Sequence, residues 1–164
     1  MCVSPLQTRR RLIVSVVAAG AVSALPASVL AQAGPAADDP LAPNPAEFKA
    51  AMTRFTGAAK PVSEGLLLDV PLLADNPSAV PVKVEVTLPI TEQDWCEEVI
   101  VLAELNPSPL ACQMQFTAAT GTAEASVRLR LSQSQTIHAL ARMHSGKVLT
   151  AKQPVTVAVS GCGM

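Results

Sequence analysis

The sequence predicts an all-β fold, an antiparallel β-sandwich of two layers with a short N-terminal helix and a flexible C-terminal arm. From Pro61 onward, apolar and polar residues alternate in short runs, which is the period of a half-buried strand. Turn-forming residues separate these runs at spacings of about ten residues, as in sandwich domains. No helical pattern follows each strand, so a parallel sheet with crossover helices is not expected.

The first 33 residues have the pattern of a secretory signal. Arg9 to Arg11 precede an apolar stretch over residues 12–24, and Ala31-Gln32-Ala33 forms a small-residue cleavage site. The apolar stretch is shorter than the roughly 20 residues that a membrane-spanning helix needs. Residues 8–13 also fit the twin-arginine pattern, with ordinary secretion as the alternative. We therefore expect a periplasmic protein, exported by the twin-arginine route and not held in the membrane.

A leader and a short helix are expected to follow the signal. Residues 34–44 are rich in Pro and Ala and lack apolar periodicity, which indicates a disordered leader. Asn44 can cap a helix that starts at Pro45, with Glu47 three positions after the cap, and Gly57 can end it. The helix has one apolar face, formed by Phe48, Ala51, Met52 and Phe55. We expect this face to pack over the sandwich.

The sandwich domain is expected to span residues 45–159. Its strands are expected at 66–70, 80–86, 98–104, 110–116, 123–131, 136–144 and 155–159. The Asn-Pro-Ser-Pro sequence at 106–109 predicts a rigid loop between two of them. Ser145-Gly146 predicts a tight hairpin between two others. The cysteine and tryptophan spacing of antibody domains is absent, so these patterns predict the architecture only.

The charge of the chain excludes a strongly basic nucleic-acid-binding surface. Without residues 1–33 the chain keeps nine basic and 13 acidic residues, a formal charge of −4. The sequence also has no CxxC motif, no glycine-rich phosphate loop and no recognisable catalytic triad. The acids around Trp95 and Cys96 are interpreted as the solvated start of a strand, with an acidic binding patch as the alternative. They are Glu92, Asp94, Glu97 and Glu98.

The two histidines do not predict a metal site. His138 and His144 share one face of a strand with Leu140 and Arg142, and no further ligand has metal-binding spacing nearby. We expect this face to be solvated, and we expect no metal and no bound cofactor.

Three cysteines remain once the signal, with Cys2, is removed. An odd number leaves at least one thiol without a partner in the chain. A hairpin about the 106–109 loop would place Cys112 opposite Ala103, and Cys96 would then lie over ~20 Å away along the strand. That separation exceeds the reach of a disulfide. We expect Cys96 and Cys112 to be separate buried or half-buried thiols, with a disulfide as the alternative.

Cys162 is the strongest functional candidate. It lies between Gly161 and Gly163, directly after a strongly patterned strand, so a firm scaffold would present a mobile thiol. No Lys, Arg or His lies within nine residues, whereas a self-sufficient thiol catalyst has an adjacent base or cation. Cys162 is therefore interpreted as a covalent attachment point in an arm that spans 160–164. The alternatives are an interaction module that forms a disulfide with a partner and a thiol sulfurtransferase.

Four stretches in order resemble one family. The end, SGCGM, is similar to the family's GGCGG, and LADNPSAVPVKVEV is similar to its AENG…VPV stretch. AELNPSPLACQMQF resembles its NP-x-P turn, and ASVRLRLSQSQTIHALARMHSGKV resembles its RxRL…AxAxM..G segment. From about Asn44 to its end, the chain resembles SoxY, the sulfur-carrier subunit of periplasmic thiosulfate oxidation (the Sox system).

The resemblance implies a specific function. It implies an immunoglobulin-like sandwich that forms a heterodimer with a SoxZ-like subunit. A haem enzyme would join thiosulfate to Cys162, a dimanganese hydrolase would release sulfate, and a sulfane dehydrogenase would oxidise the sulfur that stays behind. In this scheme the chain is a carrier and not an enzyme. Ser160 and Met164 stand where the family has glycines, and we expect Met164 to narrow the choice of partner.

Overall fold

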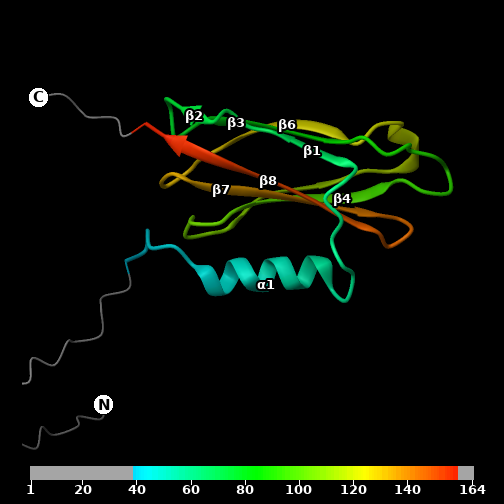
Figure 1. The fold of residues 1–164 in the computed structure, drawn as a ribbon, viewed down its shortest axis with the longest axis horizontal. Coiled ribbons are helices and arrows are strands. Elements are labelled where there is room, and N and C mark those ends of the chain that lie inside the picture. Colours follow the sequence, from blue (N-terminus) through cyan, green and yellow to red (C-terminus); the bar gives the residue numbers. More distant parts are fainter. Residues whose placement is uncertain (1–38, 159–164) are drawn as a thin grey trace, which may run out of the picture. The chain divides into compact units, whose positions relative to one another are not determined.

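A computed structural model describes residues 39–158 of the chain as one helix and eight strands in two sheets (Figure 1). One sheet has the strand order β1-β3-β6 and the other the order β2-β8-β7-β4-β5. The elements are α1 (Pro45–Thr56), β1 (Leu66–Asp69), β2 (Leu73–Ala74), β3 (Val80–Val86), β4 (Cys96–Ala103), β5 (Leu110–Gln115), a short 3₁₀ helix η1 (Ala118–Thr120), β6 (Glu124–Leu129), β7 (Gln135–Met143) and β8 (Val148–Val157). The predicted two-layer sandwich is confirmed.

The core between the sheets consists almost entirely of aliphatic side chains. Strand β3 shows the alternation most clearly, because its four valines are buried and point toward the other sheet. Strand β4 contributes Val99, Val101 and Ala103, each 0% exposed. Burial of one such valine stabilises the fold by about 1.5–3 kcal/mol. The alternating valines therefore hold the layers together, without an aromatic centre.

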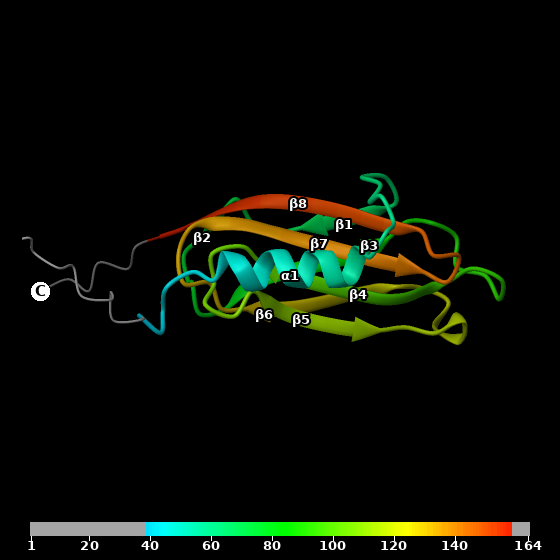
Figure 2. The same ribbon diagram turned by 90° about the horizontal axis from the view of Figure 1, so that it is seen from below.

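Helix α1 covers the outer face of the five-stranded sheet (Figure 2). The side chain of Asn44 accepts a hydrogen bond from the Glu47 N–H at 3.0 Å, and Gly57 ends the helix at a φ of 55°. Phe55 is buried against the outer-facing side chains of the sheet, which are Ile100, Leu102, Leu140 and Val148. The predicted helix, its cap and its packing are confirmed.

The covering helix overturns one expectation. Leu140 is 0% exposed beneath α1, and the His138 ring packs edge-on against Phe48 with its centroid 5.1 Å away. Arg142 lies 4.4 Å from the centroid of the Phe55 ring and donates a 2.7 Å hydrogen bond to the Phe55 carbonyl. The face that these residues share is therefore not solvated, because the helix lies on it. His144, beyond the strand, is half exposed and stacks on Trp95.

Strand β8 is longer than expected, starting at Val148 and running through Pro154. On the side of β8 that faces away from β7, the N–H of Thr150 donates to the carbonyl of Val62, and the N–H of Thr156 donates to the carbonyl of Leu72. Pro154 lies between these two threonines, and its nitrogen faces the same side of β8 as theirs. At Pro154 no strand pairs with that side of β8, so the absent N–H of proline has no acceptor to leave unpaired. The proline therefore breaks no hydrogen bond of the sheet.

Strand β2 departs from the expected antiparallel arrangement. The two-residue strand β2 lies parallel to the end of β8, with Leu73 opposite Thr156 and Ala74 opposite Val157. The pattern of the sequence did not indicate this strand, since two residues are too few to show a period of two. The hairpin at Ser145-Gly146 and the 106–109 loop between β4 and β5 are confirmed.

Cys96 and Cys112 are separate free thiols, as expected. The partner of Cys112 on β4 is Val101 rather than Ala103. The connection between the strands is not centred on residues 106–109, because Leu102 already pairs with Leu110. Five residues of strand, about 17 Å, separate Val101 from Cys96. Cys96 is 0% exposed, and burial raises the pKa of its thiol to about 11. The nearby charges of Glu97 and Glu98 raise it further, whereas the hydrogen bond to the Glu98 carbonyl opposes the shift.

The acids at the start of β4 have partners across the fold. Asp94 accepts two hydrogen bonds from Ser145, and Glu97 lies 2.7 Å from a ring nitrogen of His144. Glu98 pairs with Arg142 at 3.3 Å. These side chains are half-buried rather than fully solvated, and they tie β4 to the β7–β8 hairpin.

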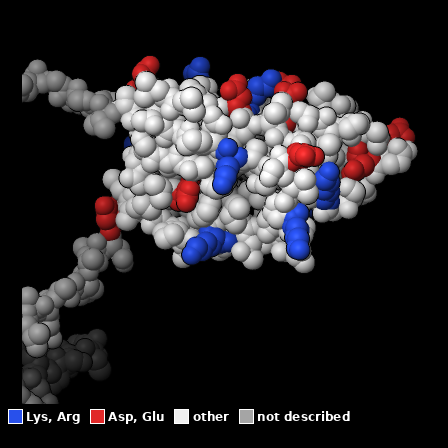
Figure 3. Space-filling model, viewed as in Figure 1, with Lys and Arg blue, Asp and Glu red and all other residues white. Residues whose placement is uncertain are grey.

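On the face seen in Figure 3, acidic and basic side chains are interspersed. Within the described residues, no helix is long and apolar enough to cross a membrane.

Candidate functional site

All five residues of the predicted arm lie outside the described part of the chain. They are Ser160, Gly161, Cys162, Gly163 and Met164. The structure describes the end of β8 that leads to them and the loops around it. The candidate site is therefore built from its base.

The end of β8 is held from both sides. On one side, the N–H groups of Thr156 and Ala158 donate to the carbonyls of Leu72 and Ala74 at 2.8 and 2.9 Å. On the other side, the N–H of Val157 donates to the hydroxyl of Ser134 at 3.0 Å. Three successive backbone amides are thus bound in alternating directions. This fixes the position and direction of the chain four residues before Cys162.

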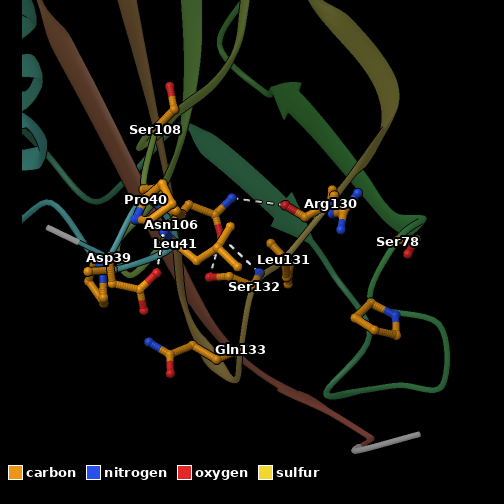
Figure 4. A pocket seen from close by; sticks show the side chains of 14 residues that line it. Asp39, Pro40, Leu41, Ser78, Asn106, Ser108, Arg130, Leu131, Ser132 and Gln133 are labelled. Carbon is orange, nitrogen blue, oxygen red and sulfur yellow. Dashed lines mark hydrogen bonds between the residues drawn. The ribbon is translucent and has the colours of Figure 1, made fainter. Parts of the chain in front are cut away.

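An open hollow of about 900 Å³ lies at the same end of the sandwich (Figure 4). Segments far apart in the sequence line it, among them residues 39–43, 77–78, 106–108 and 130–133. The β6–β7 loop connects this hollow to the end of β8, because Ser132 and Gln133 line it and Ser134 binds Val157. Arg130 and Asp39 give the lining one charge of each sign.

Asn106 organises the wall of this hollow. Its amide donates to the carbonyl of Arg130 at 2.9 Å (Figure 4). Its carbonyl oxygen accepts from the N–H and the hydroxyl of Ser132 and from the side chain of Gln135. Gln135 is only 6% exposed and also accepts from the N–H of Leu105 at 2.7 Å. The network ties the β4–β5 loop to the β6–β7 loop, which in turn holds the end of β8.

Sequence reasoning identified the loop that contains Asn106 but not the network. Its partners lie 24 to 29 residues away, so no local pattern indicates them. Ser134 was missed for the same reason, since its partner Val157 lies 23 residues away. An asparagine before a proline marks a turn, and that was the only available signal.

The described residues at this end of the sandwich hold the strand in position. Among residues 39–158, no three His, Cys, Asp or Glu side chains gather in a way that could hold a metal ion. Cys96, the buried thiol, has its pKa raised by burial and lies near the other end of β4 from the 106–108 loop. The base of the site is thus suited to hold a chain segment in place.

Comparison with known proteins agrees with this architecture. A family model described as "Sulfur oxidation protein SoxY" matches residues 52–162, more than half of the chain. No curated protein matches the sequence.

Solved structures share the fold at low sequence identity. The sulfur carrier protein SoxY from Chlorobium limicola f thiosulfatophilum is 20% identical with a TM-score of 0.58, covering 71% of this chain and 100% of that one. A superoxide reductase (neelaredoxin) from Ignicoccus hospitalis is 14% identical with a TM-score of 0.52, covering 58% of this chain and 82% of that one. At these identities the likeness shows the immunoglobulin-like fold alone. The family match, which extends to Cys162, adds the identity: the chain belongs to the SoxY family of sulfur oxidation proteins.

Proposed function

We propose that this chain is a covalent carrier of thiosulfate-derived sulfur, with Cys162 as the attachment point, in the periplasmic Sox pathway. The single observation that carries the proposal is the family match, whose last matched residue is Cys162. The chain itself needs no cofactor in this role. The enzymes that load and process the sulfur are separate proteins.

The geometry of the strand end supports the proposal. Backbone hydrogen bonds fix the chain as far as Ala158, and four residues lead from there to Cys162. A chain extends at most about 3.3–3.6 Å per residue, so the Cys162 backbone stays within about 14 Å of Ala158. A thiol limited to this radius around a fixed base can be offered to successive enzymes that dock at the same end. The open hollow beside the base gives that end a concave surface of mixed polar and apolar residues.

The chemistry of the proposal balances without any group from the described residues. In the loading step, Cys–SH and S₂O₃²⁻ form Cys–S–S–SO₃⁻, and a proton and two electrons leave. A haem-containing enzyme accepts the electrons. In the next step water cleaves the S–SO₃ bond, giving Cys–S–SH, SO₄²⁻ and a proton, on a separate hydrolase. A sulfane dehydrogenase then oxidises the remaining sulfur. The thiol is a substrate throughout.

The partner and the compartment belong to the same proposal. A SoxZ-like subunit is the proposed heterodimer partner, as the family implies. Export by the twin-arginine route would bring the folded pair to the periplasm, which fits the arginines and the apolar stretch within residues 1–33. Met164 is proposed to limit which enzymes accept the arm.

Mass spectrometry of the C-terminal peptide tests the attachment point. The purified chain is incubated with thiosulfate and a Sox-type haem enzyme, then digested without reductant. The expected result is a thiosulfonate adduct on the peptide that contains Cys162, which disappears on reduction. The variant Cys162→Ser should carry none, whereas Cys112→Ser, a matched change at a half-exposed thiol, should load normally.

Other outcomes would contradict the proposal. If the Cys162→Ser variant still acquired the thiosulfate-derived adduct, Cys162 would not be the attachment point. Only protein–protein disulfides on the C-terminal peptide would indicate the alternative function, an interaction module. Thiosulfate turnover by the isolated chain would indicate a sulfurtransferase.

A further inference from the structure

Strand β6 (Glu124–Leu129) is an edge of the three-stranded sheet, with β3 on one side only. The N–H of Val86 donates to the carbonyl of Ala123 at 2.9 Å, so Ala123 directs its backbone groups toward β3. In an antiparallel ladder the direction alternates from residue to residue. The N–H and C=O groups of Glu124, Ser126 and Arg128 therefore point away from the sheet.

The charges on this free edge are complementary to those of a second copy. Glu124 and Arg128 lie symmetrically about Ser126, and all three side chains are exposed on the outer face of the sheet. When two such strands pair antiparallel about a two-fold axis through Ser126, each Glu124 lies opposite the copy's Arg128. Directly opposite residues on one face of such a pair interact, and opposite charges stabilise the pairing.

The same register also agrees with the backbone and with the inner face. It places the outward-pointing groups of Glu124 opposite those of Arg128, and Ser126 opposite Ser126, so each N–H meets a C=O. On the inner face, Ala125 of one copy lies opposite Val127 of the other. Both side chains are half-buried at the rim of the core and would be covered by the pairing.

The neighbouring edge does not oppose this arrangement. Strand β1, one edge of the three-stranded sheet, packs against β8 and β7 of the other sheet. Strand β6, the opposite edge of the three-stranded sheet, therefore lies over β5, an edge of the five-stranded sheet (Figure 2). Strand β5 carries no charged residue, and the uncharged stretch extends from residue 105 to 123. Two copies joined at β6 would thus bring uncharged strands toward each other. Natural edge strands that avoid pairing carry charges that repel a copy, and here the signs attract.

We propose that β6 is a self-association surface, which pairs antiparallel with β6 of a second copy about an axis through Ser126 and joins the two three-stranded sheets into one. In each copy Lys83 already binds Glu124 at 2.8 Å, so Arg128 of the other copy adds a second cation to the same carboxylate. This surface is independent of Cys162 and of the proposed carrier function.

Charge exchange along the strand tests the proposal. Sedimentation velocity of the purified chain, with reductant present to exclude disulfide-linked copies, is expected to show a monomer–dimer equilibrium. Arg128→Glu places two carboxylates opposite each other and should weaken association by about tenfold, and Glu124→Arg should do the same. The double variant Glu124→Arg/Arg128→Glu should restore the dimer, as should mixing the two single variants in equal amounts.

Two controls separate this surface from general effects of charge. Glu85→Lys changes the other carboxylate that Lys83 binds, at 3.4 Å, without touching the free edge, and should leave association unchanged. Ser126→Pro removes the central outward N–H and should abolish the dimer while the thermal unfolding midpoint stays near that of the parent. A monomer at all concentrations, or a dimer that all these variants leave intact, would overturn the proposal.

Discussion

The hydroxyl of Ser134 lies 3.0 Å from the backbone nitrogen of Val157, the last residue of β8, and accepts its hydrogen bond. This contact joins the loop that lines the hollow to the strand that leads to Cys162. We predict that Ser134→Ala speeds hydrogen exchange of the Val157 amide by about tenfold, the equivalent of one lost hydrogen bond. Ser108→Ala, a change at an exposed serine of the same hollow, is the control. Equal exchange in both variants would mean that Ser134 does not hold the strand end.

The Asn106 network predicts a larger loss of stability. Asn106→Ala leaves the buried side chain of Gln135 without one acceptor and the carbonyl of Arg130 without its donor. We expect the free energy of unfolding in urea to fall by about 1–3 kcal/mol. Asn76→Ala removes an asparagine whose side chain accepts only a local bond, from Ser78, and should cost clearly less. A similar loss in both variants would contradict a bracing role for Asn106.

Leu140 should reveal how firmly α1 is attached. It is 0% exposed between β7 and the helix, so Leu140→Ala leaves a cavity beneath Phe55. We predict a loss of about 2–5 kcal/mol in the free energy of unfolding, together with faster exchange in α1. Leu67→Ala, at a leucine that is 56% exposed, should change stability little. If α1 exchanged at its parental rate in Leu140→Ala, the helix would not depend on this contact.

Cys96 predicts a pH dependence in alkaline solution. Its thiol has a pKa of about 11 in the folded chain, against 9.0 for an ordinary cysteine, because burial disfavours the thiolate. Between these values the unfolded chain has lost the proton and the folded chain still holds it. Stability from this group is therefore complete below pH 9 and is lost as the pH rises toward 11, by on the order of 1–2 kcal/mol.

The measurement compares the parent with Cys96→Ala in urea at several pH values. Lysine side chains also lose protons in alkaline solution, but they are common to both chains and cancel in the difference. The stability difference between the two chains should shrink between pH 9 and 11. A constant difference across that range would show that the folded Cys96 titrates like a free thiol.

Local patterns determined what could be predicted from the sequence. The valines of β3 alternate with polar residues, and the cap at Asn44 is a local motif, so both elements were predicted at nearly their observed bounds. Strand β2 has two residues and Pro154 interrupts the pattern of β8, so one strand was missed and the other was shortened. The pairing of Cys112 was wrong by two residues because the β4–β5 connection is centred nearer to β4 than the Asn-Pro-Ser-Pro sequence, as the pairing of Leu102 with Leu110 shows.

The least predictable features were those that depend on contacts between distant segments. His138 and Arg142 alternate with buried residues along β7, a pattern that is typical of solvent-exposed positions. Only the position of α1 shows that the helix covers these two side chains. The network around Asn106 joins three segments, and its members are ordinary turn residues in the sequence. For the site itself, the sequence indicated the cysteine and the structure added the base that holds the strand before it.

The parallel contact between β2 and β8 has a consequence for the reach of the thiol. The ladder ends with the bond from Ala158 to Ala74, and in the proposed carrier function this bond sets the point from which the four residues to Cys162 extend. Without β2, the last hydrogen bond of the strand end would be the one from Val157 to Ser134, one residue further from Cys162, and the radius would widen by the length of that residue. The two residues of β2, nearly 90 positions before the cysteine, thus help to set its working distance in the proposed function.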